Sequence, residues 1–265
     1  MSHATQTTGA RAAPVVFLTG ASTGIGEALA RHYAGMGATL GLVARQQARL
    51  ETLAASLPGR HFAYAADVRD AQAMQSAADD FMRQAGVPDI VIGNAGVSVG
   101  TLTGEPEDLA AFETVFDINV LGLVRTFAPF VKPMQAQRSG SLVGIASVAG
   151  IRGIPGSGAY SASKAAAISY LESLRVELHG SGVRVQTLCP GYIDTPMTEK
   201  NPYPMPFLLS ADEAAPRFAR VIARGTSYAV VPWQMAIVAK LLRLLPNAVF
   251  DFAFAKAGRK PRGTL

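Results

Sequence analysis

A short apolar run followed directly by spaced glycines constrains the fold of this chain more than any other feature. Residues 15–19 (VVFLT) are apolar and largely β-branched, which is typical of a buried parallel strand. Glycines follow within TGASTGIG (19–26), and residues 25–36 then have the pattern of a helix. Such a turn can bind a pyrophosphate, because the helix end presents free N–H groups and glycine lets the phosphate approach the backbone. Tight packing alone is the alternative, since the spacing G-x-x-x-G-x-G differs from the general dinucleotide motif G-x-G-x-x-G.

Strand and helix patterns alternate along the rest of the chain. The expected strands are 15–19, 39–44, 61–66, 89–93, 140–146, 183–188 and 227–231, and the expected helices are 25–36, 46–56, 70–85, 107–132 and 160–180. The alternation predicts an α/β fold, with residues 1–265 forming a single-domain doubly wound parallel sheet of about seven strands and helices on both faces. Two segments depart from it: a proline-rich insertion at 192–215 and an apolar extension at 233–265 with a basic tail.

Composition restricts the class of protein. The single cysteine, Cys189, excludes an internal disulfide and favours a reducing compartment, so we expect a cytoplasmic protein. No segment has the ~20 uninterrupted apolar residues of a membrane-spanning helix, and no signal peptide is apparent. The net charge of +5 is concentrated in a basic C-terminus, without a nucleic-acid-binding or zinc pattern. We therefore expect neither a nucleic acid partner nor a metal.

A tyrosine and a lysine one helical turn apart form the second motif. Tyr160 and Lys164 (YSASK) would lie on one face of a helix, where an ammonium near a phenol lowers the pKa of the tyrosine. Taken alone, such a pair is more often surface packing. Ser147 follows the expected strand 140–146, at the edge where open α/β sheets place their ligands.

Together with several shorter motifs, these segments resemble the short-chain dehydrogenase/reductase family. The matching segments occur in the family's order and at its usual separations, and they are TGASTGIG (19–26), Asp67-Val68, Asn94-Ala95-Gly96, Asn119, Ser147, Tyr160 with Lys164, and Pro190-Gly191 with Thr195. The resemblance implies an NAD(P)-dependent oxidoreductase that transfers a hydride between a nicotinamide and a carbonyl or alcohol. It also implies a homodimer or homotetramer that pairs through helices 107–132 and 160–180.

By resemblance, four residues carry the chemistry. Ser147 would hydrogen-bond the substrate oxygen, and Tyr160 would be the general acid in reduction and the base in oxidation. Lys164 would lower the pKa of Tyr160 and hold the nicotinamide ribose. Asn119, an awkward residue inside a helix, would distort helix 107–132 and anchor a water that relays protons to Lys164.

The cofactor-binding residues predicted from the family motifs and from strand ends surround the same sheet edge. They are Gly20, Ser22, Thr23, Gly24, Ile25, Gly26, Arg45, Asp67, Val68, Asn94, Ala95, Gly96, Tyr160, Lys164, Pro190, Gly191, Ile193 and Thr195. In the family the aspartate touches the adenine, although Asp67 could instead cap the helix that starts near Asp70. Asn94 is interpreted as structural rather than chemical, and Ile193 and Thr195 would contact the carboxamide side of the nicotinamide.

Arg45 determines the predicted choice of cofactor. The strand 39–44 ends in alanine, where an acidic residue would bind the 2′-hydroxyl of NAD, and Arg45 follows at once. A guanidinium can pair with the 2′-phosphate of NADP. NADP(H) is therefore the preferred cofactor and NAD(H) the secondary one, with a solvent-facing Arg45 as the alternative.

The segment 192–215 is expected to be the substrate lid. Its apolar side chains are Met197, Tyr203, Met205, Phe207 and Leu208, which favours a bulky apolar ketone or secondary alcohol. Burial of these side chains against a neighbouring subunit is the alternative. Within the family the alternatives are a 3-oxoacyl reductase or a reductase of steroids or lipid ketones, and outside it a non-catalytic NADP sensor.

The segment 233–245 predicts an apolar helix that Pro246 ends. Packing over the substrate cleft or against a partner subunit is favoured for it. A membrane-surface contact, aided by the basic tail, is the less favoured alternative.

Overall fold

Seven parallel strands form the main sheet, in the order β3-β2-β1-β4-β5-β6-β9. The computed structural model describes residues 13–199 and 201–263. The strands are β1 (Val15–Thr19), β2 (Thr39–Ala44), β3 (His61–Ala65), β4 (Ile90–Gly93), β5 (Ser141–Ile145), β6 (Arg184–Pro190) and β9 (Tyr228–Val231). The predicted doubly wound sheet is confirmed, and the strand order reverses between β1 and β4, which is where such sheets bind ligands.

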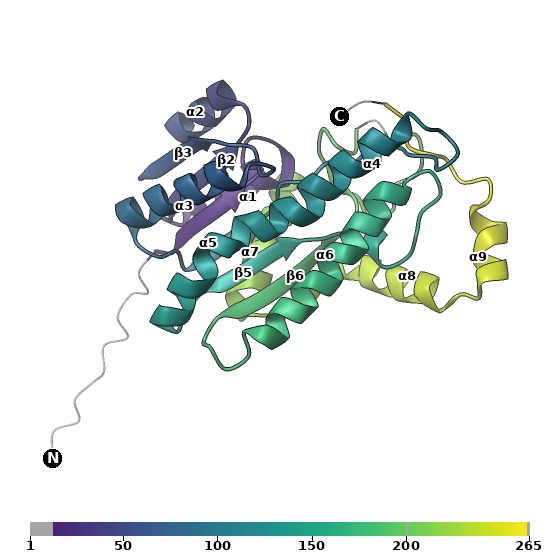
Figure 1. Cartoon of the computed structure of the whole chain (residues 1–265). Helices are drawn as coiled ribbons and strands as arrows, with labels where there is room; N and C mark the ends of the chain where they lie inside the picture. The colour runs from purple at the N-terminus through teal and green to yellow at the C-terminus, as the bar shows by residue number, and fades with distance from the viewer. Residues whose placement is uncertain (1–12, 200, 264–265) are drawn as a thin grey trace, which may run out of the picture.

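Helices cover both faces of this sheet, which explains why its central strands are largely apolar. One face carries α1 (Gly24–Gly35), α2 (Gln47–Ser56) and α7 (Ala211–Arg224), and the other carries α3 (Ala71–Ala85), α5 (Gly122–Gln137) and α6 (Gly158–Glu177). Figure 1 shows α5 and α6 in front of the sheet. Leu29 and Phe218 pack on the first face, and Phe81, Phe127 and Leu171 on the second. Burial on both faces is what a parallel sheet requires.

The predicted helix 107–132 is interrupted in the structure. It consists of α4 (Asp108–Phe116), a π-helical turn (Asp117–Leu121) and α5, and the N–H of Gly122 donates to the carbonyl of Asp117 across the wider turn. Such turns are frequent at functional sites. The run 108–137 is long and apolar enough to pass a composition test for a membrane span, but half of that window is buried in the fold. It is a core helix that packs on the sheet through α5.

Two helices, α7 and α9 (Asn247–Phe254), were not predicted from the sequence. α7 begins inside the segment 192–215, so the proline-rich insertion is shorter than expected. Residues 195–199 and 201–208 lie between two short paired strands, β7 (Ile193–Asp194) and β8 (Leu209–Ser210). That this segment is the substrate lid stays a prediction. The start of α7 is a capping box, in which the Ser210 hydroxyl accepts from the N–H of Glu213 and the Glu213 carboxylate accepts from the N–H of Ser210. The S-x-x-E spacing was a readable signal.

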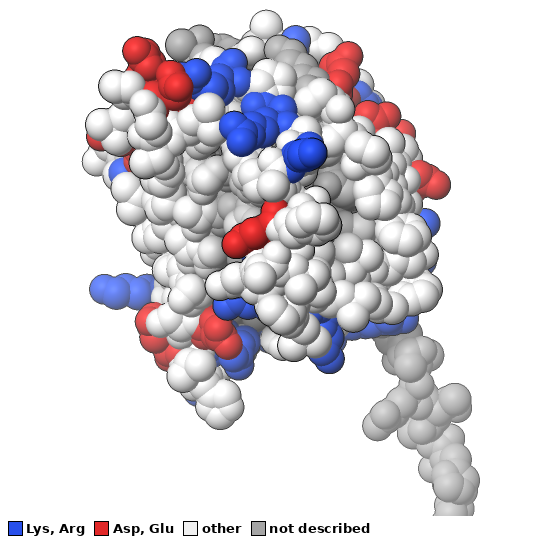
Figure 2. Space-filling view, turned by 90° about the vertical axis from the view of Figure 1, so that its right-hand side faces the viewer, with Lys and Arg blue, Asp and Glu red and all other residues white. Residues whose placement is uncertain are grey.

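The predicted C-terminal helix is α8 (Trp233–Leu244), and only one side of it is packed against the fold. Met235 and Ala239 are buried, whereas its opposite side is apolar and exposed, from Trp233 (67%) to Leu244 (71%). Figure 2 views the molecule from the right-hand side of Figure 1 and shows broad uncharged areas with charged side chains in scattered groups.

Arg152, in the loop after β5, anchors the end of α8. Its guanidinium donates to the carbonyls of Leu242 (2.6 Å) and Leu245 (2.7 Å) and lies 4.0 Å from the centre of the Phe250 ring. These carbonyls at a helix end have no partners within the helix. One side chain therefore joins both C-terminal helices to the loop that follows Ser147.

Candidate active site

The glycine-rich turn after β1 has the backbone geometry that requires glycine. Gly20 and Gly24 have φ angles of 66° and 56°, in the left-handed region. A Cβ on Gly26 would overlap the carbonyl oxygen of Gly20. The Asn94 side-chain amide donates to the carbonyls of Thr19 (3.1 Å) and Gly20 (3.2 Å), which supports its structural interpretation. The turn is thus held tightly enough to present its N–H groups at the start of α1.

Gly26→Ala should destabilise this turn, because the added methyl group has no space. We expect a loss of about 1–3 kcal/mol, which lowers Tm by roughly 2–10 °C in a chain of this size, together with weaker NADPH binding. Thermal unfolding and fluorescence titration measure both. Gly35→Ala is the matched control in α1, since nothing lies within 4 Å of its added Cβ. Equal melting temperatures for the two variants would contradict the packing role of Gly26.

Two adjoining clefts lie along the carboxyl edge of the sheet. The first is lined by catalytic candidates Ser147, Tyr160 and Lys164 and by Gly20, Thr23, Gly24, Ile25, Asn94, Ala95, Gly96, Pro190, Gly191, Ile193 and Thr195. The second is lined by Gly20, Ser22, Thr23, Arg45, Asp67, Val68, Ala95 and Gly96. Every predicted site residue except Gly26 and Asn119 therefore lines one of the two clefts. The sequence analysis had not singled out the small apolar residues Ala146, which lines the first cleft, and Ala66, which lines the second.

Lys164 is almost completely buried beneath the first cleft. Its side chain is 5% exposed, and its ammonium donates to the carbonyl of Ile145 (2.8 Å) at the end of β5. The ammonium nitrogen lies 5.8 Å from the centre of the Tyr160 ring. Burial lowers the pKa of Lys164 to about 8. The hydrogen bond to the Ile145 carbonyl therefore holds the ammonium at the edge of the sheet, near the phenol of Tyr160.

The electrostatic environment of Tyr160 is dominated by burial. Burial raises its pKa above the ordinary value, and a hydrogen bond with Ser147 offsets only part of that increase. The net direction is upward because desolvation of the phenolate outweighs the other influences, and the predicted lowering by Lys164 stays a prediction. The phenol is accordingly protonated at neutral pH, which is the state that a proton donor needs.

Asn119 lies behind the cleft, in the π-helical turn, and connects three segments. Its oxygen accepts from the N–H of Val97 (2.8 Å), and its amide donates to the Val97 carbonyl (3.0 Å) and the Ser163 hydroxyl (3.0 Å). Ser163 in turn donates to the carbonyl of Tyr160 (2.8 Å). The turn thereby positions both the loop after β4 and the helix that carries Tyr160. In this structure Asn119 therefore fixes the positions of neighbouring segments. Its role as the anchor of a water that relays protons to Lys164 stays a prediction.

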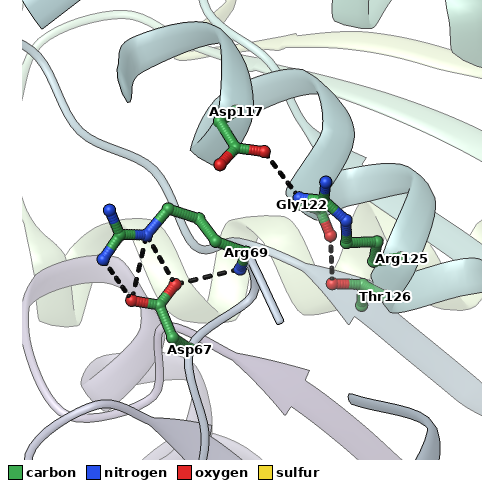
Figure 3. A network of polar contacts seen from close by, with 6 residues as sticks. All are labelled: Asp67, Arg69, Asp117, Gly122, Arg125 and Thr126. Atoms are coloured by element: carbon green, nitrogen blue, oxygen red, sulfur yellow. Dashed lines mark hydrogen bonds and ion pairs between the residues drawn. The ribbon is translucent and has the colours of Figure 1, made fainter. Parts of the chain in front are cut away.

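The second cleft contains an ion pair that the sequence analysis missed. Asp67 accepts from the guanidinium of Arg69 through both oxygens, at distances of 2.7–3.1 Å, and from the Arg69 N–H. Figure 3 shows this pair beside a second one between Asp117 and Arg125. The hydrogen bonds from Arg69 hold the pKa of Asp67 below its ordinary value. Asp70, and not Asp67, caps α3 by accepting from the N–H groups of Gln72 and Ala73.

The loop Pro190–Thr195 lies against both the glycine turn and α8. An added Cβ on Gly24 would meet Thr195 at 3.0 Å, and one on Gly191 would meet Met235 at 2.6 Å. The absence of side chains at Gly20, Gly24 and Gly191 leaves a continuous cradle along both clefts. These residues fit an extended dinucleotide whose pyrophosphate lies at the start of α1.

A doubly wound sheet with this cradle, and with a serine, a tyrosine and a lysine meeting at its carboxyl edge, defines a dinucleotide-dependent oxidoreductase. Comparison with known families agrees, since a profile described as short chain dehydrogenase matches residues 14–204. The chain belongs to the short-chain dehydrogenase/reductase family, whose members are NAD(P)-dependent oxidoreductases acting on CH–OH groups.

Similar proteins include both uncharacterised and named reductases. An uncharacterised oxidoreductase of Myxococcus xanthus is 36% identical over 89% of this chain and 94% of its own length. A 3-oxoacyl acyl-carrier-protein reductase of Thermotoga maritima is 34% identical over 71% of this chain and 77% of its own. Among solved structures, levodione reductase has a TM-score of 0.77 at 27% identity, covering 84% of this chain and 98% of that one.

Proposed function

We propose that this chain is an NADP-dependent carbonyl reductase or alcohol dehydrogenase whose substrate is a bulky apolar ketone or secondary alcohol. The observation that carries the proposal is the convergence of Ser147, Tyr160 and Lys164 on one cleft beside the glycine cradle. Ser147 and Lys164 are buried, Tyr160 is partly exposed, and all three meet at the carboxyl edge of the sheet. A sensor that had lost its chemistry would not need all three.

A division of labour follows from the surroundings of each group. When bound, a nicotinamide cofactor would supply the hydride. Tyr160 would donate the proton to the substrate oxygen, because its raised pKa keeps the phenol protonated. Ser147 would hydrogen-bond the same substrate oxygen and orient it. Lys164 would stabilise the phenolate that remains after proton transfer, since its ammonium lies 5.8 Å from the centre of the Tyr160 ring.

The preference for NADP(H) is supported by the charges around the second cleft. Arg45 is exposed at its edge, directly after Ala44 of β2. The only carboxylate that lines this cleft in the described residues belongs to Asp67, and Arg69 is paired with it. A 2′-phosphate would therefore meet one unpaired guanidinium and a neutralised aspartate. NAD(H) lacks that phosphate, so Arg45 would contribute less to its binding free energy.

An apolar substrate is supported by the lid. Met197 lines the first cleft, and Phe207 and Leu208 remain half exposed on the same segment. The rings of Tyr192 and Tyr203 lie 6.4 Å apart at its base. The 34% identity with a 3-oxoacyl reductase adds thioesters to the substrates worth testing.

A homodimer or homotetramer remains part of the proposal. Large apolar side chains are exposed on the helical layer through which pairing was predicted, namely Leu109, Leu121 and Val176. Light scattering of the purified chain gives the mass directly, and a monomer at micromolar concentration would remove this part. The cytoplasmic location stays a prediction.

The decisive test follows the NADPH absorbance during incubation with apolar ketones, aldehydes, diketones and 3-oxoacyl thioesters. Turnover that is confined to one of these classes would support the reductase and identify its substrate class. NADPH binding without turnover of any compound would favour the sensor alternative.

A further inference from the structure

The C-terminal tail returns across the molecule and ends beside α4. Figure 1 shows the chain leaving α9 and running back along the edge of the fold toward α4. Gly258 lies opposite Tyr203 of the lid, where an added Cβ would be 3.3 Å from the tyrosine Cβ. The N–H of Gly100 donates to the carbonyl of Pro261 (2.9 Å), and Arg262 forms ion pairs with Asp108 and Glu105. The tail is therefore fixed at its far end rather than loose.

Lys260 lies within this tail, between two segments that border the first cleft. Its ammonium donates to the Ser98 hydroxyl (3.0 Å) and to the Met197 carbonyl (3.0 Å). Ser98 follows Asn94-Ala95-Gly96 in the loop after β4, and Met197 belongs to the lid and lines the cleft together with Tyr160. Burial lowers the pKa of Lys260 to about 8, and no carboxylate of the described residues pairs with it. A partly desolvated cation whose hydrogen bonds go only to neutral acceptors costs stability.

We propose that residues 258–262, here called the strap, close the mouth of the substrate cleft, and that Lys260 is a positioning residue that fastens the lid to the loop after β4. Lys260 joins these two segments through one side chain, whereas Gly258 lies against the lid and Pro261 binds the loop after β4. Through Met197 the strap sets where the lid lies relative to Tyr160. The inference deepens the proposed function, since the cleft that it shapes is the proposed substrate site.

Limited digestion with chymotrypsin tests the strap without any substrate. The lid contains Tyr203, Phe207 and Leu208, and its cleavage requires the segment to open locally. In Lys260→Met we expect cleavage within 197–208 to be about tenfold faster than in wild type, the factor for one lost hydrogen bond to a charged donor. Lys256→Met, an exposed cation of the same tail, is the matched control and should keep the wild-type rate. Equal cleavage rates in Lys260→Met and Lys256→Met would overturn the proposal.

A double-mutant cycle tests whether the contact with Ser98 carries the effect. Ser98→Ala alone should also speed lid cleavage, and adding it to Lys260→Met should change little further, because both remove the same contact. Additive effects would overturn the proposed fastening. Ser98→Ala also provides the test if Lys260→Met lowers the folded yield, which circular dichroism and thermal unfolding measure.

Kinetics then separate positioning from the chemistry of the site. For a ketone that wild type reduces, Lys260→Met should raise KM about tenfold, leave kcat within about twofold and keep the Kd of NADPH, while Lys260→Arg restores the wild-type KM. An unchanged KM would overturn the positioning role. If wild type reduces no compound, the proposed function fails. The digestion rates still test the strap independently, because that experiment needs no substrate.

Discussion

Tyr160→Phe is expected to abolish nearly all turnover while leaving NADPH binding unchanged. The substitution removes only the phenolic oxygen, so the ring still packs above Lys164 at the cleft. General acid catalysis by a positioned side chain contributes about 10²–10⁴-fold, and kcat should fall by that factor. Burial raises the pKa of the phenol, so Tyr160 is protonated at neutral pH and starts the reduction in the proton-donor state. Stopped-flow or steady-state loss of NADPH absorbance gives kcat, and fluorescence titration gives the Kd.

Tyr170→Phe is the matched control for this experiment. Tyr170 lies on the same helix, is partly buried, and has a pKa raised by burial to about 12, yet it lines neither cleft. Its loss should leave kcat within about twofold of wild type. Retained activity in Tyr160→Phe, beside an unaffected control, would mean that another group donates the proton. A loss of NADPH binding in Tyr160→Phe would instead indicate a damaged site.

The features that were predicted correctly depend on local chemistry. β1 and its glycine turn are visible in sequence because buried strands need apolar residues and left-handed turns need glycine. The seven strands could be placed for the same reason, and most of the predicted site residues line one of the two clefts because they end successive strands at one edge. A parallel sheet thus converts positions along the chain into neighbours in space.

The features that were missed depend on contacts between distant segments. The π-helical turn at Asn119 agrees with the distortion of helix 107–132 that the resemblance implied, but the contacts of its amide with Val97 and Ser163 were missed, because neither residue is close in sequence. The raised pKa of Tyr160 reflects burial by the whole fold, which the Tyr-x-x-x-Lys spacing does not contain. Lys260 meets Ser98 across 162 residues, so no local pattern could reveal the strap. α7 differs, since its capping box was legible and was overlooked among prolines.

Arg45→Asp is expected to reverse the preference between NADPH and NADH. In wild type the exposed guanidinium stands at the edge of the second cleft and can pair with a 2′-phosphate. The substitution removes that partner and places a carboxylate where it repels the phosphate and can accept from a ribose 2′-hydroxyl instead. We expect the ratio of the two Kd values to shift by about 100-fold toward NADH, the loss of a charge-assisted pair accounting for much of it.

Two control variants test whether the change in cofactor preference depends on where the charge is changed or only on the change in net charge. Arg49→Asp makes the same change in net charge on α2 without lining the second cleft, so its Kd ratio should stay near that of wild type. Arg69→Ala is the complementary variant, because it frees the Asp67 carboxylate at the cleft and should weaken NADPH more than NADH through repulsion. An unchanged ratio in Arg45→Asp would refute the assignment of Arg45 to the 2′-phosphate. A shift in Arg69→Ala alone would instead make the Asp67–Arg69 pair the element that selects the cofactor.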